Sequence, residues 1–118
     1  AVVLSALLRL NNSTKEEVSA KIEQFSERRK TAQPPGASMG SMFKNPEGDH
    51  AGRLIEAAGL KGTRIGNAEI SKVHGNFIIN HGETRAMDVR ELIDLTRRTV
   101  KQKLGVELEL EVEFVGEW

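Results

Sequence analysis

The stretch Gly36-Ala37-Ser38-Met39-Gly40-Ser41-Met42-Phe43-Lys44-Asn45-Pro46 is the least ordinary part of this 118-residue chain. Small residues lead to Ser41, and a Phe, a Lys, an Asn and a Pro follow. Glycine tolerates unusual backbone angles and leaves room for close approach, so a loop of this composition can bring backbone near a ligand. Ser41 and Asn45 can each offer a hydrogen bond, and Lys44 a charge. A tight turn rich in small residues explains the pattern about equally well.

Upstream of this loop, the sequence predicts a strand and then a helix. Residues 2–10 are apolar and begin with valines, as in a strand that is buried on both faces. Ser13 and Glu16 form a capping-box pattern that starts the helix, and Pro34 stops it because proline disfavours a helical predecessor. We expect this helix to bury an apolar stripe made of Val18, Ile22 and Phe25.

Arg29 lies four residues after Phe25 and therefore extends the same face of this helix. A guanidinium at the end of a buried stripe, close to the loop, can have an anionic partner. It can also lie along the edge of the core and reach water. The residues alone leave these two roles near parity.

Downstream of the loop, the sequence predicts a short helix and a pair of strands. Asp49 is placed to cap the helix, whose inward residues are expected to be Leu54, Ile55 and Ala58. Residues 63–80 are predicted to form a strand, a turn at residues 74–76 and a second strand. The second strand contains the apolar run 77–79, which we expect to be buried on both faces.

The C-terminal third is predicted to form one helix and one strand. Thr84 is placed to cap the helix and Gly105 to end it; its inward stripe is Val89, Leu92, Ile93, Thr96 and Val100. Residues 106–114 alternate strictly, with apolar residues on one face and Glu107, Glu109, Glu111 and Glu113 on the other. Such a row is most often solvated, although one carboxylate can enter a cleft. Together these elements predict an α+β fold, a small, mostly antiparallel sheet with about three helices packed on it.

Composition excludes several classes of function. The 17 basic residues balance the 17 acidic ones, so no broad field draws nucleic acid or an anionic membrane to the chain. No apolar run approaches membrane-spanning length, and no signal peptide is visible. Cysteine is absent, which excludes disulfides and thiolate metal sites. These features fit a cytoplasmic protein with neither a nucleic-acid nor a membrane partner.

Several kinds of site are also disfavoured by spacing. We expect no metal, because the candidate ligands lack close spacing; they are Asp49, His50, His74 and His81. Ser41 does not stand in the Gly-x-Ser-x-Gly pattern of a hydrolase nucleophile. Gly40 is not followed by the Gly-Lys-Ser/Thr ending of a phosphate-binding loop.

Six segments nevertheless form a specific set in fixed order: residues 28–35, 36–46, 51–62, 64–71, 74–80 and 105–112. In this order they resemble the C-terminal, substrate-binding domain of the UDP-N-acetylenolpyruvoylglucosamine reductase (MurB) family, in its shorter, loop-lacking branch. The resemblance covers nearly the whole chain. It implies part of a flavoprotein oxidoreductase of peptidoglycan biosynthesis. Such an enzyme reduces UDP-N-acetylglucosamine enolpyruvate to UDP-N-acetylmuramate with FAD and NADPH.

The resemblance implies a catalytic pair. Reduced flavin passes a hydride to the vinyl carbon of the enolpyruvyl ether, and the loop serine, here Ser41, then protonates the adjacent carbon. A free serine is a poor acid, so it can serve only when the intermediate is a strong base within hydrogen-bond distance. The resemblance also implies that Glu111, in the last strand, is an acid or hydrogen-bond partner of the enolate-like intermediate. A protonated Glu111 requires a pKa raised by burial or by nearby charge.

The resemblance also implies residues that bind the UDP-sugar. Asn45 matches a position that contacts the diphosphate, with Lys44 beside it, and Arg29 and Gln33 match substrate-binding positions ahead of the loop. The planar fork of arginine suits a diphosphate. Glu113 stands where relatives commonly have an arginine that can touch the flavin nucleotide, so the flavin-binding residues of this chain stay unassigned. Leu110 stands where a proline is common.

The resemblance predicts two regions. Residues 1–10 are the last strand of, or junction from, a preceding FAD-binding domain that we expect in cis or in trans, and residues 11–118 are the substrate-binding domain. This part alone is expected to be inactive, because FAD and a substrate-binding arginine belong to the preceding domain. The alternative is a non-catalytic module that binds nucleotide diphosphates or a protein partner. Glu111 distinguishes the two, because a diphosphate pocket gains nothing from a carboxylate.

Overall fold

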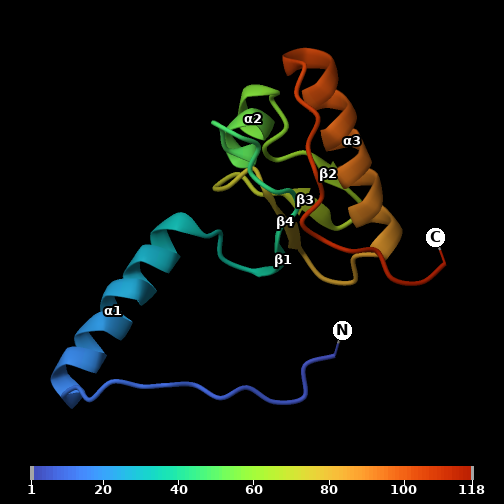
Figure 1. The fold of residues 1–118 in the computed structure, drawn as a ribbon. Helices are drawn as coiled ribbons and strands as arrows, with labels where there is room; N and C mark the ends of the chain where they lie inside the picture. The colour runs from blue at the N-terminus through green and yellow to red at the C-terminus, as the bar shows by residue number, and fades with distance from the viewer. Residues whose placement is uncertain (1, 118) are drawn as a thin grey trace.

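A single antiparallel sheet organises the chain in the computed structural model, which describes residues 2–117. The elements are α1 (Lys15–Ala32), β1 (Ala37–Ser41), α2 (Ala51–Ala57), β2 (Arg64–Ile65), β3 (Ala68–Ile70), β4 (Phe77–Asn80) and α3 (Ala86–Leu104). The strand order is β1-β4-β3-β2, and every pairing is antiparallel. In Figure 1, α3 lies along the sheet with α2 at its end, whereas α1 projects away. The predicted α+β fold is confirmed.

The apolar core lies between the sheet and the helices α2 and α3. The inward stripe predicted for α3 is confirmed, because Leu92, Ile93, Thr96 and Val100 are buried and Val89 is half-buried. The inward residues predicted for the short helix are confirmed too. The sheet contributes alternate residues to the core, among them Ile70 and Ile78, which face each other across β3 and β4. The apolar run 77–79 is buried as expected.

A buried asparagine ties the segment after β1 to the turn between β3 and β4. The side-chain oxygen Oδ1 of Asn76 accepts the Phe43 N–H at 3.0 Å, and Nδ2 donates to the Phe43 carbonyl at 2.7 Å. The Met42 N–H donates to the backbone carbonyl of Asn76 at 2.9 Å. Met42 and Phe43 are only 0% and 1% exposed, and without Asn76 the Met42 N–H and both backbone groups of Phe43 would be buried without partners. Asn76 therefore takes the place of a neighbouring strand.

The prediction that residues 106–114 form a strand is wrong. One isolated bridge, Phe43↔Leu110, joins this segment to the residues after β1, and Pro46 has no N–H with which a ladder could continue. The alternation is kept in burial, because Leu108 is buried while the four glutamates are exposed. The remaining apolar residues of the segment are half-buried and pack against the core. An extended chain over a core is therefore sufficient to produce the pattern.

The prediction that helix α1 buries an apolar stripe is also wrong, because none of the residues of this helix is buried. The stripe predicted to face a core is open to solvent, with Val18, Ile22 and Phe25 exposed by 46%, 60% and 61%. The predicted strand is wrong too, because residues 2–10 are irregular and exposed. These apolar segments need a surface on which to pack, and residues 2–117 supply none. None of the helices in this part of the chain has the length and apolar character that crossing a membrane requires.

Helix starts were predicted to within one or two residues. The cap of α1 is Thr14 with Glu17, in place of Ser13 with Glu16; the Glu17 N–H donates to the Thr14 hydroxyl at 3.2 Å. The N-cap residue of α3 is Arg85, in place of Thr84, and its N–H donates to the Asp88 carboxylate at 3.3 Å. Gly105 ends α3 as predicted, in the left-handed conformation.

Replacing the buried asparagine should destabilise the fold. We expect Asn76→Ala to lower the free energy of unfolding by about 2 to 3 kcal/mol, because it leaves the Phe43 N–H and carbonyl buried without partners. Urea denaturation followed by circular dichroism measures this change. The matched control is Asn67→Ala, which removes an exposed side-chain bond to the Gly82 carbonyl and should cost under about 1 kcal/mol. Equal losses in the two variants would contradict the role of Asn76.

Candidate functional site

The segment after β1, the start of α2 and the turn between β3 and β4 enclose a polar cleft of about 280 Å³. The cleft brings together two of the predicted site residues, Ser41 and Asn45. Its lining also includes four residues that the sequence did not assign to a site: His50, Arg53, His74 and Asn76. A larger hollow of about 590 Å³ follows α3 and contains none of the predicted site residues.

A β-bulge before Ser41 decides which way its side chain points. Ser38 pairs with Ile79, and Ser41 with Phe77, so three steps along β1 match two along β4. Gly40 lies inside this bulge with φ +85°, which is unfavourable for any residue with a Cβ. The extra residue moves Ser41 to the face of Phe77, opposite the core face of Ile78. The Ser41 hydroxyl makes no hydrogen bond to residues 2–117 and is half-buried in the cleft.

Asn45 holds the start of α2. Its Oδ1 accepts the N–H of Ala51, the first residue of that helix, at 3.0 Å. Asp49, the predicted cap, instead accepts the His50 N–H at 2.7 Å and pairs with Arg53. The other end of the Asn45 carboxamide, Nδ2, donates to no group within the described residues. Asn45 is therefore both a structural cap and an available donor at the cleft.

The cations along the cleft have acidic partners. Arg53 pairs with Asp49, whose pKa it lowers to about 2 with help from the His50 N–H. Lys61 Nζ lies 2.7 Å from a carboxylate oxygen of Glu56. The cleft is therefore polar without carrying a strong uncompensated positive charge.

Glu111 and Lys44 lie on the bridge between residues 41–44 and the C-terminal segment. The Glu111 N–H donates to the Met42 carbonyl at 2.9 Å, which places the backbone of Glu111 beside that of Met42, the residue after Ser41. The side chain of Glu111 is exposed, so the described residues do not supply the burial expected for it. Lys44 is bound by Glu109, and this hydrogen bond, with a smaller contribution from Glu111, raises the pKa of Lys44.

Arg29 and Gln33 share a different hollow, of about 500 Å³, at the end of α1. Both are exposed, and Arg29 has no ion-pair partner among residues 2–117. The structure therefore places Arg29 and Gln33 in one hollow, which is separate from the cleft of Ser41. Arg29 does not lie along the edge of a core, because α1 has no buried face. Its role with an anionic partner stays a prediction.

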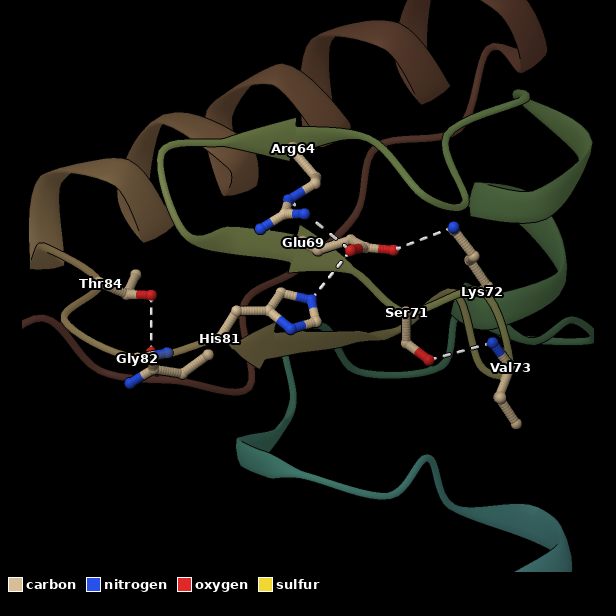
Figure 2. A network of polar contacts seen from close by, with 9 residues as sticks. Arg64, Glu69, Ser71, Lys72, Val73, His81, Gly82 and Thr84 are labelled. Atoms are coloured by element: carbon tan, nitrogen blue, oxygen red, sulfur yellow. Dashed lines mark hydrogen bonds and ion pairs between the residues drawn. The ribbon is translucent and has the colours of Figure 1, made fainter.

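A second polar cluster lies on the sheet and outside the cleft. The buried carboxylate of Glu69 accepts from His81 Nε2 at 2.9 Å and lies 3.7 Å from Arg64 Nε and 3.8 Å from Lys72 Nζ. Figure 2 shows these three side chains converging on Glu69 from β2, from the turn after β3 and from the end of β4. The cluster is a compensated structural network. Within residues 2–117, no group of three or more His, Asp or Glu residues is placed to hold a metal ion.

Two glycines explain how α2 and the turn come close enough to form the cleft. A Cβ at Gly75 would lie 2.8 Å from the Gly52 carbonyl oxygen. A Cβ at Gly52 would lie 2.8 Å from Cε1 of His74. The sequence shows both glycines, but it does not show that they meet. Knowledge of this contact would have identified His74 as a cleft residue, but the contact cannot be seen in the sequence.

The fold and the cleft define a small two-layer α+β domain with a polar cleft at one end of its sheet. A sequence model described as UDP-N-acetylenolpyruvoylglucosamine reductase, C-terminal domain, matches residues 30–115. The chain belongs to this family.

Relatives and a solved structure agree with this assignment. The reductase of that name from Chloroflexus aggregans is 51% identical over 114 residues, which are 97% of this chain and 38% of the relative. The one from Moorella thermoacetica is 52% identical over 103 residues, 85% of this chain and 33% of the relative. The crystal structure of the Thermus caldophilus reductase (MurB) matches with a TM-score of 0.70 and 48% identity, over 87% of this chain and 37% of that one. The chain therefore spans between 33% and 38% of the length of these relatives.

The bulge gives a testable expectation for Gly40. We expect Gly40→Ala to cost about 1 kcal/mol of stability through its positive φ, and to shift the backbone and side-chain NMR signals of Ser41. Gly48→Ala is the matched control, because Gly48 also has a positive φ (75°) and, like Gly40, open space where a Cβ would lie. The control should lose similar stability without moving the Ser41 signals. Unchanged Ser41 signals in Gly40→Ala would show that the bulge does not orient this serine.

The Asp49–Arg53 pair gives a pH dependence. The folded-state pKa of Asp49, about 2, lies below the ordinary value of 3.8, so this carboxylate stabilises the fold above pH 3.8 and loses that effect as the pH falls through 2. In Arg53→Met we expect its pKa to rise toward 3.8, measured by NMR titration of the carboxyl carbon. Arg98→Met, on α3, should leave it unchanged. A pKa still near 2 in Arg53→Met would assign the shift to the His50 N–H instead.

Proposed function

We propose that this chain is the substrate-binding domain of a flavin- and NADPH-dependent reductase. The whole protein reduces UDP-N-acetylglucosamine enolpyruvate to UDP-N-acetylmuramate in peptidoglycan biosynthesis, in the cytoplasm. The observation that carries this proposal is the unpartnered hydroxyl of Ser41 in the polar cleft, next to Met42, whose carbonyl accepts the backbone N–H of Glu111. The relatives, which are named as this reductase, support it.

Ser41 is the proposed proton donor. Its hydroxyl is held half-buried by a bulge on one side and by the buried segment 42–43 on the other, so little freedom is lost when substrate binds. Its proton goes to the carbon beside the substrate carboxylate. Glu111 is proposed to support the enolate-like intermediate. Because Glu111 is exposed, we propose that substrate and a further domain supply its burial.

FAD, when bound, supplies the hydride for this reduction. The described residues fit the flavin diphosphate poorly on the side of the C-terminal segment, because an exposed row of glutamates, including Glu113, presents negative charge there. We therefore propose that another domain holds most of the FAD. The exposed apolar residues of α1 and of residues 2–10 suit contact with such a domain.

Asn45, Arg29 and Gln33 are the proposed contacts of the substrate diphosphate. Asn45 Nδ2 is an available donor at the cleft, and Arg29 has no ion-pair partner in the described residues. Lys44 can contribute its charge only after it leaves Glu109. These groups lie in separate hollows, so the proposal requires that the extended UDP-sugar spans both or that α1 moves toward the cleft.

The test uses the full-length protein with FAD, NADPH and the enolpyruvyl substrate. Ser41→Ala and Glu111→Gln should each lower kcat about 10² to 10⁴-fold, while substrate binding and the reduction of flavin by NADPH stay near normal. Ser38→Ala, on an exposed part of the same strand, is the matched control and should keep full activity. If the wild-type protein binds the UDP-sugar but never oxidises NADPH in its presence, the non-catalytic nucleotide-diphosphate or protein-binding module is the better description.

A further inference from the structure

His74 is held in one tautomer by the backbone. The N–H of Asn76 donates to Nδ1 of His74 at 3.2 Å, so Nδ1 presents its lone pair and the proton of the neutral ring is on Nε2. The ring also packs edge-on against Phe77, with centroids 4.9 Å apart and an interplanar angle of 69°. The backbone at Gly52 also lies against this ring, because a Cβ at Gly52 would clash with Cε1 of His74. This imidazole is therefore fixed in both orientation and tautomer.

His74 is a lining residue of the cleft that contains Ser41. Phe77, on which the ring of His74 packs, is the cross-strand partner of Ser41. Nε2 of His74 makes no hydrogen bond within the described residues, and neither does the Ser41 hydroxyl. A fixed donor and an unpartnered hydroxyl thus belong to two residues that line the same small cleft.

We infer that His74 is a positioning residue for Ser41, whose Oγ receives a hydrogen bond from His74 Nε2–H during proton transfer. This inference rests on the proposed function. As the substrate carbon takes the proton, the O–H bond breaks, its electron pair stays on Oγ, and a C–H bond forms. The negative charge that develops on Oγ is stabilised by a preorganised N–H, as in an oxyanion hole. Water returns the proton to Oγ after the product leaves.

The hydrogen bond also directs the serine hydrogen. When Oγ accepts from Nε2–H, its own hydrogen is free to point elsewhere, toward the substrate carbon. An imidazole with the proton on Nδ1 would do the opposite, because Nε2 would then accept the serine hydrogen. The Asn76 N–H excludes that tautomer by occupying Nδ1. The turn that ties down Phe43 through Asn76 thus also sets the chemistry offered to Ser41.

The tautomer can be measured on this chain without flavin or substrate. Long-range proton–nitrogen NMR correlations should show, for the neutral ring of His74, Nε2 as the protonated nitrogen and Nδ1 as the unprotonated one. A ring with its proton on Nδ1 would overturn the inference.

Kinetics on the full-length enzyme test the role itself. In His74→Ala we expect the reoxidation of reduced flavin by the enolpyruvyl substrate to slow about 10² to 10³-fold. Reduction of flavin by NADPH should be unchanged. His74→Gln, which keeps an N–H donor, should recover most of this loss. Gly52→Ala should slow reoxidation as well, because its methyl group displaces the ring while His74 remains.

A double-mutant cycle separates this role from a purely structural one. If His74 acts through Ser41, His74→Ala adds no further loss in a Ser41→Ala background. Additive losses would overturn the inference, and so would normal reoxidation in His74→Ala. His81→Gln is the control, because His81 contacts Glu69 outside the cleft and should keep the wild-type reoxidation rate. A wild-type enzyme that never reduces the enolpyruvyl substrate would instead refute the proposed function, while the tautomer measurement would still stand.

Discussion

The pairing of Asn76 with both backbone groups of Phe43 is the interaction on which the rest of this structure depends. Met42 and Phe43 enter the core directly after an edge strand, where no further strand of the sheet satisfies the two backbone groups of Phe43. An unpaired buried N–H or carbonyl costs about 1 to 3 kcal/mol, which is more than an ordinary hydrogen bond contributes. A single carboxamide removes that cost, because it presents a donor and an acceptor at the spacing of a peptide group.

The cleft follows from this fixed segment. With residues 42–43 anchored, the bulge at Gly40 can turn Ser41 away from the core, and Asn45 can reach the first N–H of α2. Gly75 lets the turn touch α2. The same turn therefore supports the core on one side and lines the cleft with His74 on the other. One short stretch of backbone therefore takes part both in core packing and in lining the polar cleft.

The N-terminal quarter behaves differently, because it carries apolar residues without a core of its own. Its helix is well capped, and its acidic and basic residues complement the helix dipole. Local signals of this kind determine that a helix forms and where it begins. Burial of its stripe requires a second surface, and no element among residues 2–117 provides one. The hydrophobic pattern therefore predicted helix α1 correctly, but it wrongly predicted that the apolar stripe of this helix is buried.

The sequence by itself determined the elements whose signals are local: the stripe of α3, the turn before Phe77, the αL glycine at residue 105 and the alternation of residues 106–114. It also marked Ser41 and Asn45 through the unusual composition around them. Only the tertiary structure decided that Asn76 binds Phe43, that Gly52 meets His74, and that residues 106–114 lie on the core without a ladder. The physical reason is distance along the chain. Periodicity and capping act within a few residues, whereas these contacts join residues from 22 to 67 positions apart, such as Gly52 with His74 and Phe43 with Leu110.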